Sequence, residues 1–208
     1  SKSVLIVGVG NMGGGMAANL LAKGWNVLVS DTDAKKVKKW VSKGALAQLK
    51  RARIAPDLIA VIVCVVDAAQ TENVLFGEDG LAYRLLAGQT VILCPTILPQ
   101  DVESFAARLA EREIHTIDAP VSGGPVRAAD GTMSLMVACH RAVFAQNAEL
   151  LIALSSKLFN ISENPGDAAR TKLVNNLLAG INLVGAAEAL ALAQKLGLDA
   201  TKTLDVIE

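Results

Sequence analysis

The stretch V-L-I-V-G-V-G-N-M-G, residues 4–13, decides the fold. Its apolar first half predicts a buried strand, and a G-x-G-x-x-G motif follows at the start of a helical pattern. In that context Gly8 permits a tight turn, Gly10 lets the backbone approach a pyrophosphate, and Gly13 allows close helix–strand packing. The N–H groups and dipole of the helix N-terminus favour phosphate there. The motif alone leaves open a glycine-rich packing turn without a ligand.

An acidic residue strengthens the dinucleotide interpretation. Asp31 ends the second predicted strand, N-V-L-V-S-D at 26–31. A carboxylate about twenty residues after the glycine turn accepts hydrogen bonds from ribose hydroxyls and repels a 2′-phosphate. Thr32 follows where an NADP enzyme often places an arginine, although Lys35 and Lys36 are close by. The pattern favours NAD over NADP.

Apolar runs alternate with helical patterns through most of the chain. Strands are predicted at 4–9, 26–31, 58–65, 90–94, 114–118, 132–137 and 157–161. Helices are predicted at 12–23, 34–41, 99–113 and 141–154. Repeated strand–helix units of this spacing predict the α/β class, with a Rossmann-type doubly wound, mainly parallel sheet.

The chain changes character after E-N-P-G at 163–166. One apolar helix of roughly 45 Å is predicted to about Leu196, at about 1.5 Å per residue, and it needs neighbours on most sides. A new helix begins after Gly197. We expect a dinucleotide-binding domain at 1–163, and an interdomain helix with the truncated start of an all-α domain at 164–208.

Composition argues against several classes of partner. Twenty basic and twenty acidic residues cancel, so no basic surface is expected to bind nucleic acid. The three cysteines lack metal-ligand spacing, and no metal site is expected. Polar residues interrupt the apolar segment 173–193, which favours a buried helix over a membrane span. The N-terminal run lacks a proper cleavage pattern, and a cytoplasmic protein is expected.

A lysine and two asparagines stand out in R-T-K-L-V-N-N-L, residues 170–177. At 100° per residue, Asn176 lies about 40° from Lys172 and Asn175 about 60° the other way, so all three can edge one site. A desolvated lysine has a lowered pKa and can exchange a proton with a hydroxyl or carbonyl oxygen. From the helix alone, a Lys172 that reaches solvent is the simpler interpretation.

A second glycine-rich segment, D-A-P-V-S-G-G at 118–124, follows a predicted strand. Ser122 offers a hydroxyl, while Gly123 and Gly124 expose N–H groups that can hold a carboxylate. Taken alone, the segment is as well explained as a plain turn.

Five motifs appear together in one order and spacing: G-V-G-N-M-G (8–13), V-L-F-G-E-D-G (74–80), T-I-L-P (96–99), D-A-P-V-S-G-G (118–124) and N-P-G-D-A-A-R-T-K-L-V-N-N (164–176). They resemble the β-hydroxyacid dehydrogenase family, which contains 3-hydroxyisobutyrate dehydrogenase and tartronate semialdehyde reductase. The resemblance covers essentially the whole chain.

The resemblance implies hydride transfer between NAD and a small 3-hydroxy acid, either 3-hydroxyisobutyrate-like or sugar-acid-like, with Lys172 as the catalytic acid/base. It assigns the substrate to Ser122, Gly123, Gly124, Asn175 and Asn176. It assigns the cofactor to Gly8, Gly10, Asn11, Met12, Gly13, Asp31, Thr32, Val65, Val66 and Thr96.

The sequence also departs from the family pattern. Val66 replaces a usual proline, and Pro95 replaces a serine before Thr96. Arg127, just after the glycine pair, either binds the distal oxygens of a polyhydroxy acid or a second carboxylate, or is a plain surface arginine. Family members continue through further helices that supply a second lysine, so we expect a truncated chain that forms a homo-oligomer through its long helix.

Other functions remain open at this point. The scaffold also resembles 6-phosphogluconate-type dehydrogenases and imine reductases. A phosphorylated substrate calls for more basic residues than Arg127, and imine reductases usually replace the lysine. A non-catalytic dinucleotide-binding module is the alternative of a different class.

Overall fold

The computed structural model describes residues 2–48 and 52–207. The chain divides into two compact units, Ser1–Lys172 and Leu173–Glu208. The strands are β1 (Ser3–Val7), β2 (Asn26–Ser30), β3 (Leu46–Ala47), β4 (Leu58–Val63), β5 (Thr90–Leu93), β6 (His115–Asp118), β7 (Val121–Ser122), β8 (Met133–Ala138) and β9 (Ser155–Ser162). The helices are α1 (Asn11–Ala22), α2 (Ala34–Val41), α3 (Ala68–Phe76), the short 3₁₀ turn η1 (Leu81–Tyr83), α4 (Pro99–Ala110), α5 (Gly124–Asp130), α6 (Arg141–Leu154), α7 (Asp167–Lys195) and α8 (Ala200–Ile207).

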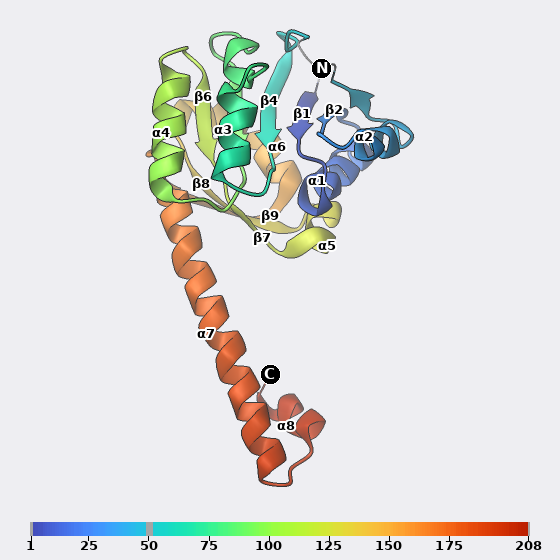
Figure 1. The fold of residues 1–208 in the computed structure, drawn as a ribbon, viewed down its shortest axis with the longest axis vertical. Helices are drawn as coiled ribbons and strands as arrows, with labels where there is room; N and C mark the ends of the chain where they lie inside the picture. Colours follow the sequence, from blue (N-terminus) through green and yellow to red (C-terminus); the bar gives the residue numbers. More distant parts are fainter. Residues whose placement is uncertain (1, 49–51, 208) are drawn as a thin grey trace. The chain divides into compact units, whose positions relative to one another are not determined.

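The first unit is built on one sheet with helices on both faces (Figure 1). Its strands follow the order β3-β2-β1-β4-β5-β6-β8, and neighbours from β3 to β6 run parallel. Strand β8 is antiparallel to β6 and to β7, and parallel to β9. The direction of winding reverses between β1 and β4, where open α/β sheets bind ligands at the carboxyl ends of their strands. The predicted doubly wound, mainly parallel fold is confirmed.

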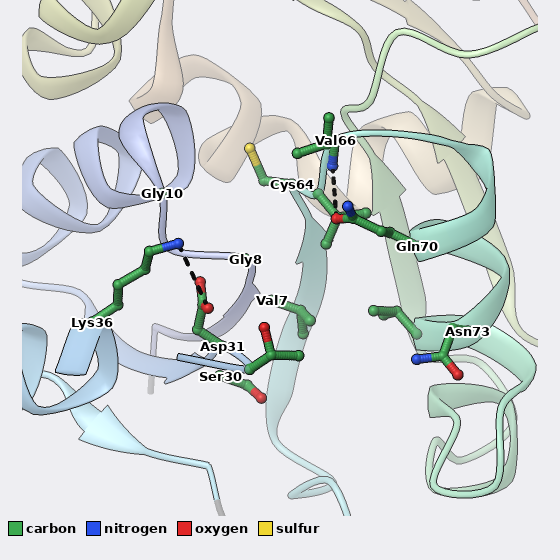
Figure 2. A pocket seen from close by; sticks show the side chains of 13 residues that line it. Val7, Gly8, Gly10, Ser30, Asp31, Lys36, Cys64, Val66, Gln70 and Asn73 are labelled. Atoms are coloured by element: carbon green, nitrogen blue, oxygen red, sulfur yellow. Dashed lines mark hydrogen bonds and ion pairs between the residues drawn. The ribbon is translucent and has the colours of Figure 1, made fainter. Parts of the chain in front are cut away.

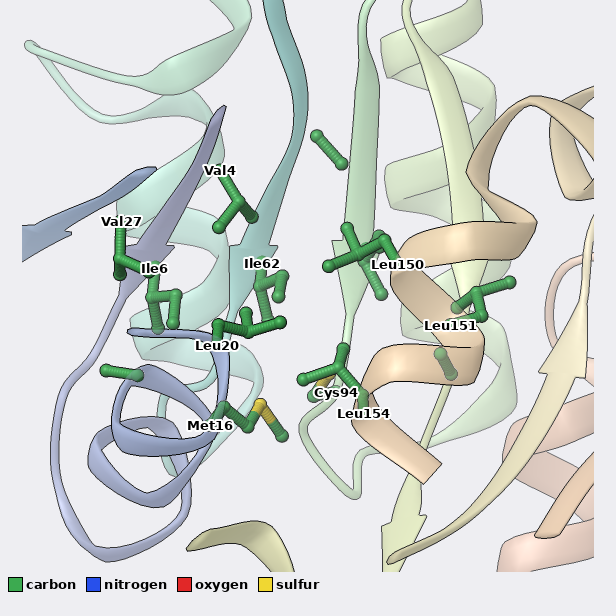
Figure 3. Close-up of a cluster of buried hydrophobic side chains, with 14 of the residues drawn as sticks. Val4, Ile6, Met16, Leu20, Val27, Ile62, Cys94, Leu150, Leu151 and Leu154 are labelled. Carbon is green, nitrogen blue, oxygen red and sulfur yellow. The ribbon is translucent and has the colours of Figure 1, made fainter. Parts of the chain in front are cut away.

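Alternation along the strands divides the core into two layers. Val4 and Ile6 of β1 face a cluster with Leu20 of α1 and Leu150 of α6, as Figure 3 shows. Leu5, between them, faces the opposite cluster, which α3 and α4 complete with Leu75, Val102, Phe105 and Leu109. Both faces are therefore covered, which explains why the strands are continuous apolar runs in the sequence.

Several elements differ from the sequence prediction. Helices α3 and α5 and the short strands β3 and β7 were not predicted. Strands β4 and β5 end one residue before Cys64 and Cys94, so neither cysteine lies within a strand. Burial raises the pKa of the Cys64 thiol to about 11, and it raises the pKa of Cys94 as well. A raised pKa keeps these thiols protonated near neutral pH, so neither has the thiolate character of a reactive cysteine.

The second unit contains the remainder of α7, followed by α8. The turn between these helices places Gly197 at φ +77°, and Asp199 caps α8 by accepting from the N–H groups of Thr201 and Lys202. Many apolar side chains of this unit are exposed, including Val174, Leu177, Leu178, Ile181, Leu183, Val184 and Leu192. By length and composition alone, α7 is long and apolar enough to cross a bilayer. The predicted domain boundary after residue 163 stays a prediction.

Candidate functional site

The glycine turn between β1 and α1 has the shape that its motif predicts. Gly8 has φ +90°, and a Cβ there would lie 2.5 Å from the carbonyl oxygen of Cys64. A Cβ on Gly13 would overlap the carbonyl oxygen of Gly8, so both positions require glycine. A Cβ on Gly10 would meet open space, and among the described residues no side chain caps the start of α1 there. The N-terminus of α1 therefore fits a phosphate group.

Asp31 ties the glycine turn to the end of β2. Its carboxylate accepts hydrogen bonds from the Val9 N–H at 2.9 Å and from the Asp33 N–H at 2.9 Å. The Lys36 Nζ lies 3.8 Å from Oδ1, and Figure 2 shows this ion pair at the pocket edge. The Asp31 side chain is 8% exposed and lines the neighbouring pocket, so it holds the glycine turn and still has acceptor capacity for a ligand.

A pocket of about 580 Å³ lies at the carboxyl ends of β1, β2 and β4 (Figure 2). It is lined by Val7, Gly8, Gly10, Ser30, Asp31, Thr32, Lys36, Cys64, Val65, Val66, Gln70, Asn73 and Val74. Six predicted cofactor residues are among them: Gly8, Gly10, Asp31, Thr32, Val65 and Val66. The predicted residues Asn11, Met12, Gly13 and Thr96 are not part of this lining. The pocket joins the glycine turn and Asp31 in one site.

Helix α3 forms a pocket wall that the sequence analysis missed, through Gln70, Asn73 and Val74. Two side-chain hydrogen bonds hold its start. The Asp67 carboxylate accepts from the Gln70 N–H at 2.8 Å, and the Gln70 side chain accepts from the Val66 N–H at 3.3 Å. An acceptor followed three residues later by glutamine is a capping-box pattern, so this signal was available in the sequence.

The predicted substrate loop is more ordered than a turn. Val121 and Ser122 pair with Leu135 and Ser134 as strand β7, and α5 begins at Gly124. Cross-strand pairing to β8 holds Ser122, which the sequence analysis did not predict, and the assignment of this segment to the substrate stays a prediction. Gly123 follows with φ +128°, a conformation that favours glycine.

Helix α5 packs against α1 through small residues. A Cβ added to Gly15 would lie 2.8 Å from the Ala128 Cβ, so the two helices approach closely. The Arg127 side chain lies across Gly123, where an added Cβ would be 2.6 Å from its Cδ. The arginine stem therefore covers the glycine that the substrate prediction assigns to a carboxylate.

Lys172 is buried, with 7% of its surface exposed. Burial lowers the pKa of its ammonium group from the ordinary 10.5. It shares a helix face with Ala168 and Ala169, which are also buried. The sequence analysis left open a desolvated lysine and one that reaches solvent. In the structure Lys172 is desolvated.

Asp118, which the sequence analysis did not single out, holds the start of α7, the helix that carries Lys172. Its buried Oδ2 accepts from the Gly166 N–H at 2.8 Å and the Ala169 N–H at 3.0 Å. Desolvation raises the pKa of this carboxyl, and the backbone hydrogen bonds oppose that rise. No local pattern identifies this cap, because its partners lie 48 and 51 residues further along the chain.

Other predicted site residues are not brought into the pocket. Asn175 and Asn176 are exposed residues of the second unit, with 3.5 Å between the amide nitrogen of one and the amide oxygen of the other. Thr96 is exposed just after β5. Their assignment to substrate and cofactor stays a prediction. Within the described ranges, no cluster of three or more His, Cys, Asp or Glu side chains could hold a metal ion.

The parallel sheet, the glycine turn and the acidic residue after β2 define a Rossmann-type dinucleotide-binding protein. Comparison with protein families agrees. Residues 3–162 match the NAD-binding domain of 6-phosphogluconate dehydrogenase. Residues 166–208 match the family described as NAD-binding of NADP-dependent 3-hydroxyisobutyrate dehydrogenase.

Individual relatives narrow the class. An L-threonate dehydrogenase of Cupriavidus necator is 35% identical over 100% of this chain and 70% of its own length. A 3-hydroxyisobutyrate dehydrogenase of Pseudomonas aeruginosa is 35% identical over 99% of this chain and 68% of its own. A crystal structure of 3-hydroxyisobutyrate dehydrogenase from Salmonella typhimurium superposes with a TM-score of 0.87 at 35% identity, covering 99% of this chain and 72% of that one. The chain belongs to the β-hydroxyacid dehydrogenase family of NAD(P)-dependent oxidoreductases.

Substituting Gly10 with alanine should weaken NAD binding on the order of tenfold, about 1.4 kcal/mol, because the added methyl group fills the space where the pyrophosphate approaches. The free energy of unfolding should change by less than about 1 kcal/mol, since that methyl group contacts no protein atom. Fluorescence titration with NADH and urea unfolding measure the two effects.

Gly180→Ala is the matched control, since a Cβ also meets open space there on helix α7. It should leave NAD affinity unchanged. Equal affinities for the Gly10→Ala protein and the wild type would contradict the assignment of this turn to the pyrophosphate.

Proposed function

We propose that this chain transfers hydride between NAD and a small 3-hydroxy acid, with Lys172 as the general acid/base. One observation carries the proposal most directly: a lysine with a lowered pKa is buried in the unit that holds the dinucleotide pocket. Burial of an ammonium is unfavourable without a functional or ionic compensation, and perturbed titrating groups concentrate at active sites.

The residues of the pocket fit the cofactor. The N–H groups at the start of α1 would hold the pyrophosphate beside Gly10, and Asp31 would accept from the ribose hydroxyls. Val65 and Val66 offer apolar surface to the adenosine end. The carboxylate of Asp31 disfavours a 2′-phosphate, and the nearby Lys36 is already paired with it. NAD is therefore the proposed cofactor in preference to NADP.

The proposed substrate-binding groups are a hydroxyl, backbone N–H groups and an amine. When bound, the nicotinamide donates or accepts the hydride. Ser122 with the N–H groups of Gly123 and Gly124 would bind the substrate carboxylate. The amine of Lys172 would take the hydroxyl proton during oxidation and return it to the carbonyl oxygen during reduction. We further assign Asn175 and Asn176 to the substrate and Asn11, Met12, Gly13 and Thr96 to the cofactor, as the family resemblance implies.

Within this class we favour a polyhydroxylated acid. The relative from Cupriavidus necator is named for L-threonate, which carries several hydroxyl groups. Arg127 lies over Gly123, and its guanidinium has no hydrogen-bond or ionic partner among the described residues. Its five N–H donors would suit the distal oxygens of such a substrate. The retained lysine argues against imine reduction, although a Streptomyces aurantiacus imine reductase shares the fold with a TM-score of 0.86 at 26% identity.

The second unit supports a proposal about assembly. Exposed leucine, isoleucine and valine side chains cover α7 on several sides, which is unfavourable in water. Asn175, Asn176, Asn182 and Glu188 interrupt this apolar surface and make a bilayer a poor environment for it. We therefore assign the surface to a second copy of this chain, in a cytoplasmic enzyme.

Replacing Lys172 with alanine should lower kcat by about 10²- to 10⁴-fold, the usual contribution of a general acid/base. In the wild type, oxidation requires the neutral amine, so its rate should rise with pH through a pKa below 10.5. Reduction requires the ammonium form, so its rate should fall across the same pH range. Absorbance of NADH, followed with a panel of 3-hydroxy acids, gives both profiles.

Lys195→Ala is the control, because this exposed lysine lies on the same helix. Its kcat and pH profile should match the wild type. A Lys172→Ala protein with the wild-type rate and pH profile would remove Lys172 from the mechanism.

Arg127→Ala should raise KM for L-threonate on the order of tenfold, because a charge-assisted hydrogen bond to a distal oxygen is lost. KM for 3-hydroxyisobutyrate, which lacks those oxygens, should change by less than about twofold. Steady-state kinetics with both acids tests this, and Arg141→Ala, at another exposed arginine, is the control. Equal KM ratios in the variant and the wild type would leave Arg127 a surface residue.

Sedimentation velocity should show the chain as a dimer or larger species. Leu183→Asp should shift it toward the monomer, because Leu183 is 74% exposed and a buried carboxylate opposes association. Gln194→Asp, at an exposed polar position of α7, should not. A monomeric wild type at micromolar concentration would contradict assembly through this helix.

A further inference from the structure

Asp118 is a buried carboxylate that lies outside the dinucleotide pocket. Its residue is 1% exposed at the carboxyl end of β6, and the pocket lining does not include it. A buried carboxylate is unfavourable unless hydrogen bonds compensate it. Here the compensation comes from the Gly166 and Ala169 N–H groups at the start of α7. The first N–H groups of any helix lack partners within the helix, and negative charge there also complements the helix dipole.

The capped turn leads directly to the lysine. Lys172 lies three residues after Ala169 and four after Ala168, which places all three on one face of α7. Ala168 packs against Met136 and Ala138 of β8, so this face is fixed on the sheet. A shift of the first turn would therefore move the lysine with it.

The same carboxylate also begins the segment that ends in the proposed substrate loop. Ser122 lies four residues after Asp118, and the intervening Pro120 carbonyl accepts from the Met136 N–H at 3.2 Å. Asp118 thus joins, through one side chain, the segment assigned to the substrate carboxylate and the helix assigned to proton transfer.

We propose that Asp118 is a positioning residue, which fixes the Lys172 amine relative to the Ser122–Gly124 segment without itself touching the substrate. This inference rests on the proposed function. It adds to that function a residue whose contribution acts through the backbone of α7. Catalysis of this kind is sensitive to small displacements, so the loss of the cap should be measurable in turnover.

A pair of exposed salt bridges at the same turn provides a matched control. Arg170 forms an ion pair with Asp167 at 2.9 Å and another with Glu103 of α4. All three side chains are well hydrated, and exposed ion pairs contribute little. Glu103→Gln therefore perturbs the start of α7 without removing either hydrogen bond to Asp118.

The test compares Asp118→Ala, Asp118→Asn and Glu103→Gln in the full chain. Asparagine keeps an amide oxygen that can accept from both N–H groups, whereas alanine keeps none. The readouts are kcat and KM, the NAD dissociation constant, and the Lys172 pKa followed by NMR of lysine labelled at Cε. If the alanine variant does not fold, Asp118→Leu, whose side chain has a similar branched shape and no acceptor, takes its place.

We expect Asp118→Ala to lower kcat on the order of tenfold or more, with NAD affinity within about twofold. The Lys172 pKa should rise toward its ordinary value, because a loosened turn admits water to the ammonium. Asp118→Asn should restore kcat to within about threefold, and Glu103→Gln should match the wild type.

An alanine or leucine variant with wild-type kcat and an unchanged Lys172 pKa overturns the proposal. An asparagine variant as impaired as alanine overturns it too, because the carboxylate charge would then matter and not the cap. Failure of the proposed function looks different: Lys172→Ala would retain full activity. The Lys172 pKa would still report whether Asp118 holds the helix.

Discussion

The close approach of α1 to the strand before it is the constraint on which the dinucleotide end of this molecule depends. Gly13 touches the carbonyl of Gly8, and Gly8 touches the carbonyl of Cys64. No side chain fits at either contact, so the helix begins directly over the carboxyl ends of β1 and β4. A third glycine, Gly15, lets α5 pack equally closely against α1. Small residues thus bring together segments that larger side chains would separate.

The sheet was predictable because the burial of each strand on both faces is visible in its own sequence, as a continuous apolar run. Segments such as 58–63 are apolar without interruption, since α3 and α4 cover one face and α1 and α6 the other. Strand β7 was not predictable, because Val121 and Ser122 are extended only through their pairing with β8. Helix α3 lies between these cases, since its Asp67–Gln70 capping pattern was present in the sequence but its apolar periodicity is weak.

The site shows the same division between local and distant causes. Gly8, Gly10 and Asp31 could be identified because the chemistry of each follows from its place in one strand–turn–helix unit. The cap at the start of α7 depends on Asp118, whose hydrogen-bond partners lie 48 and 51 residues later, so no local pattern connects them. The exposure of Asn175 and Asn176 likewise depends on what packs around α7, which periodicity alone does not specify.

Asp31 has a consequence for redesign of the enzyme. The Asp31 carboxylate, which we propose disfavours a 2′-phosphate, also accepts a hydrogen bond from the backbone N–H of the buried residue Val9 at the glycine turn. Replacing Asp31 so that a phosphorylated ribose can bind would leave the Val9 N–H without its acceptor. The glycine turn, which we propose binds the pyrophosphate, would then be less rigid. The same side chain therefore affects both the cofactor preference and the rigidity of the glycine turn. Thr32 and Lys36 also line the pocket, and neither accepts a hydrogen bond from the glycine turn among the described residues.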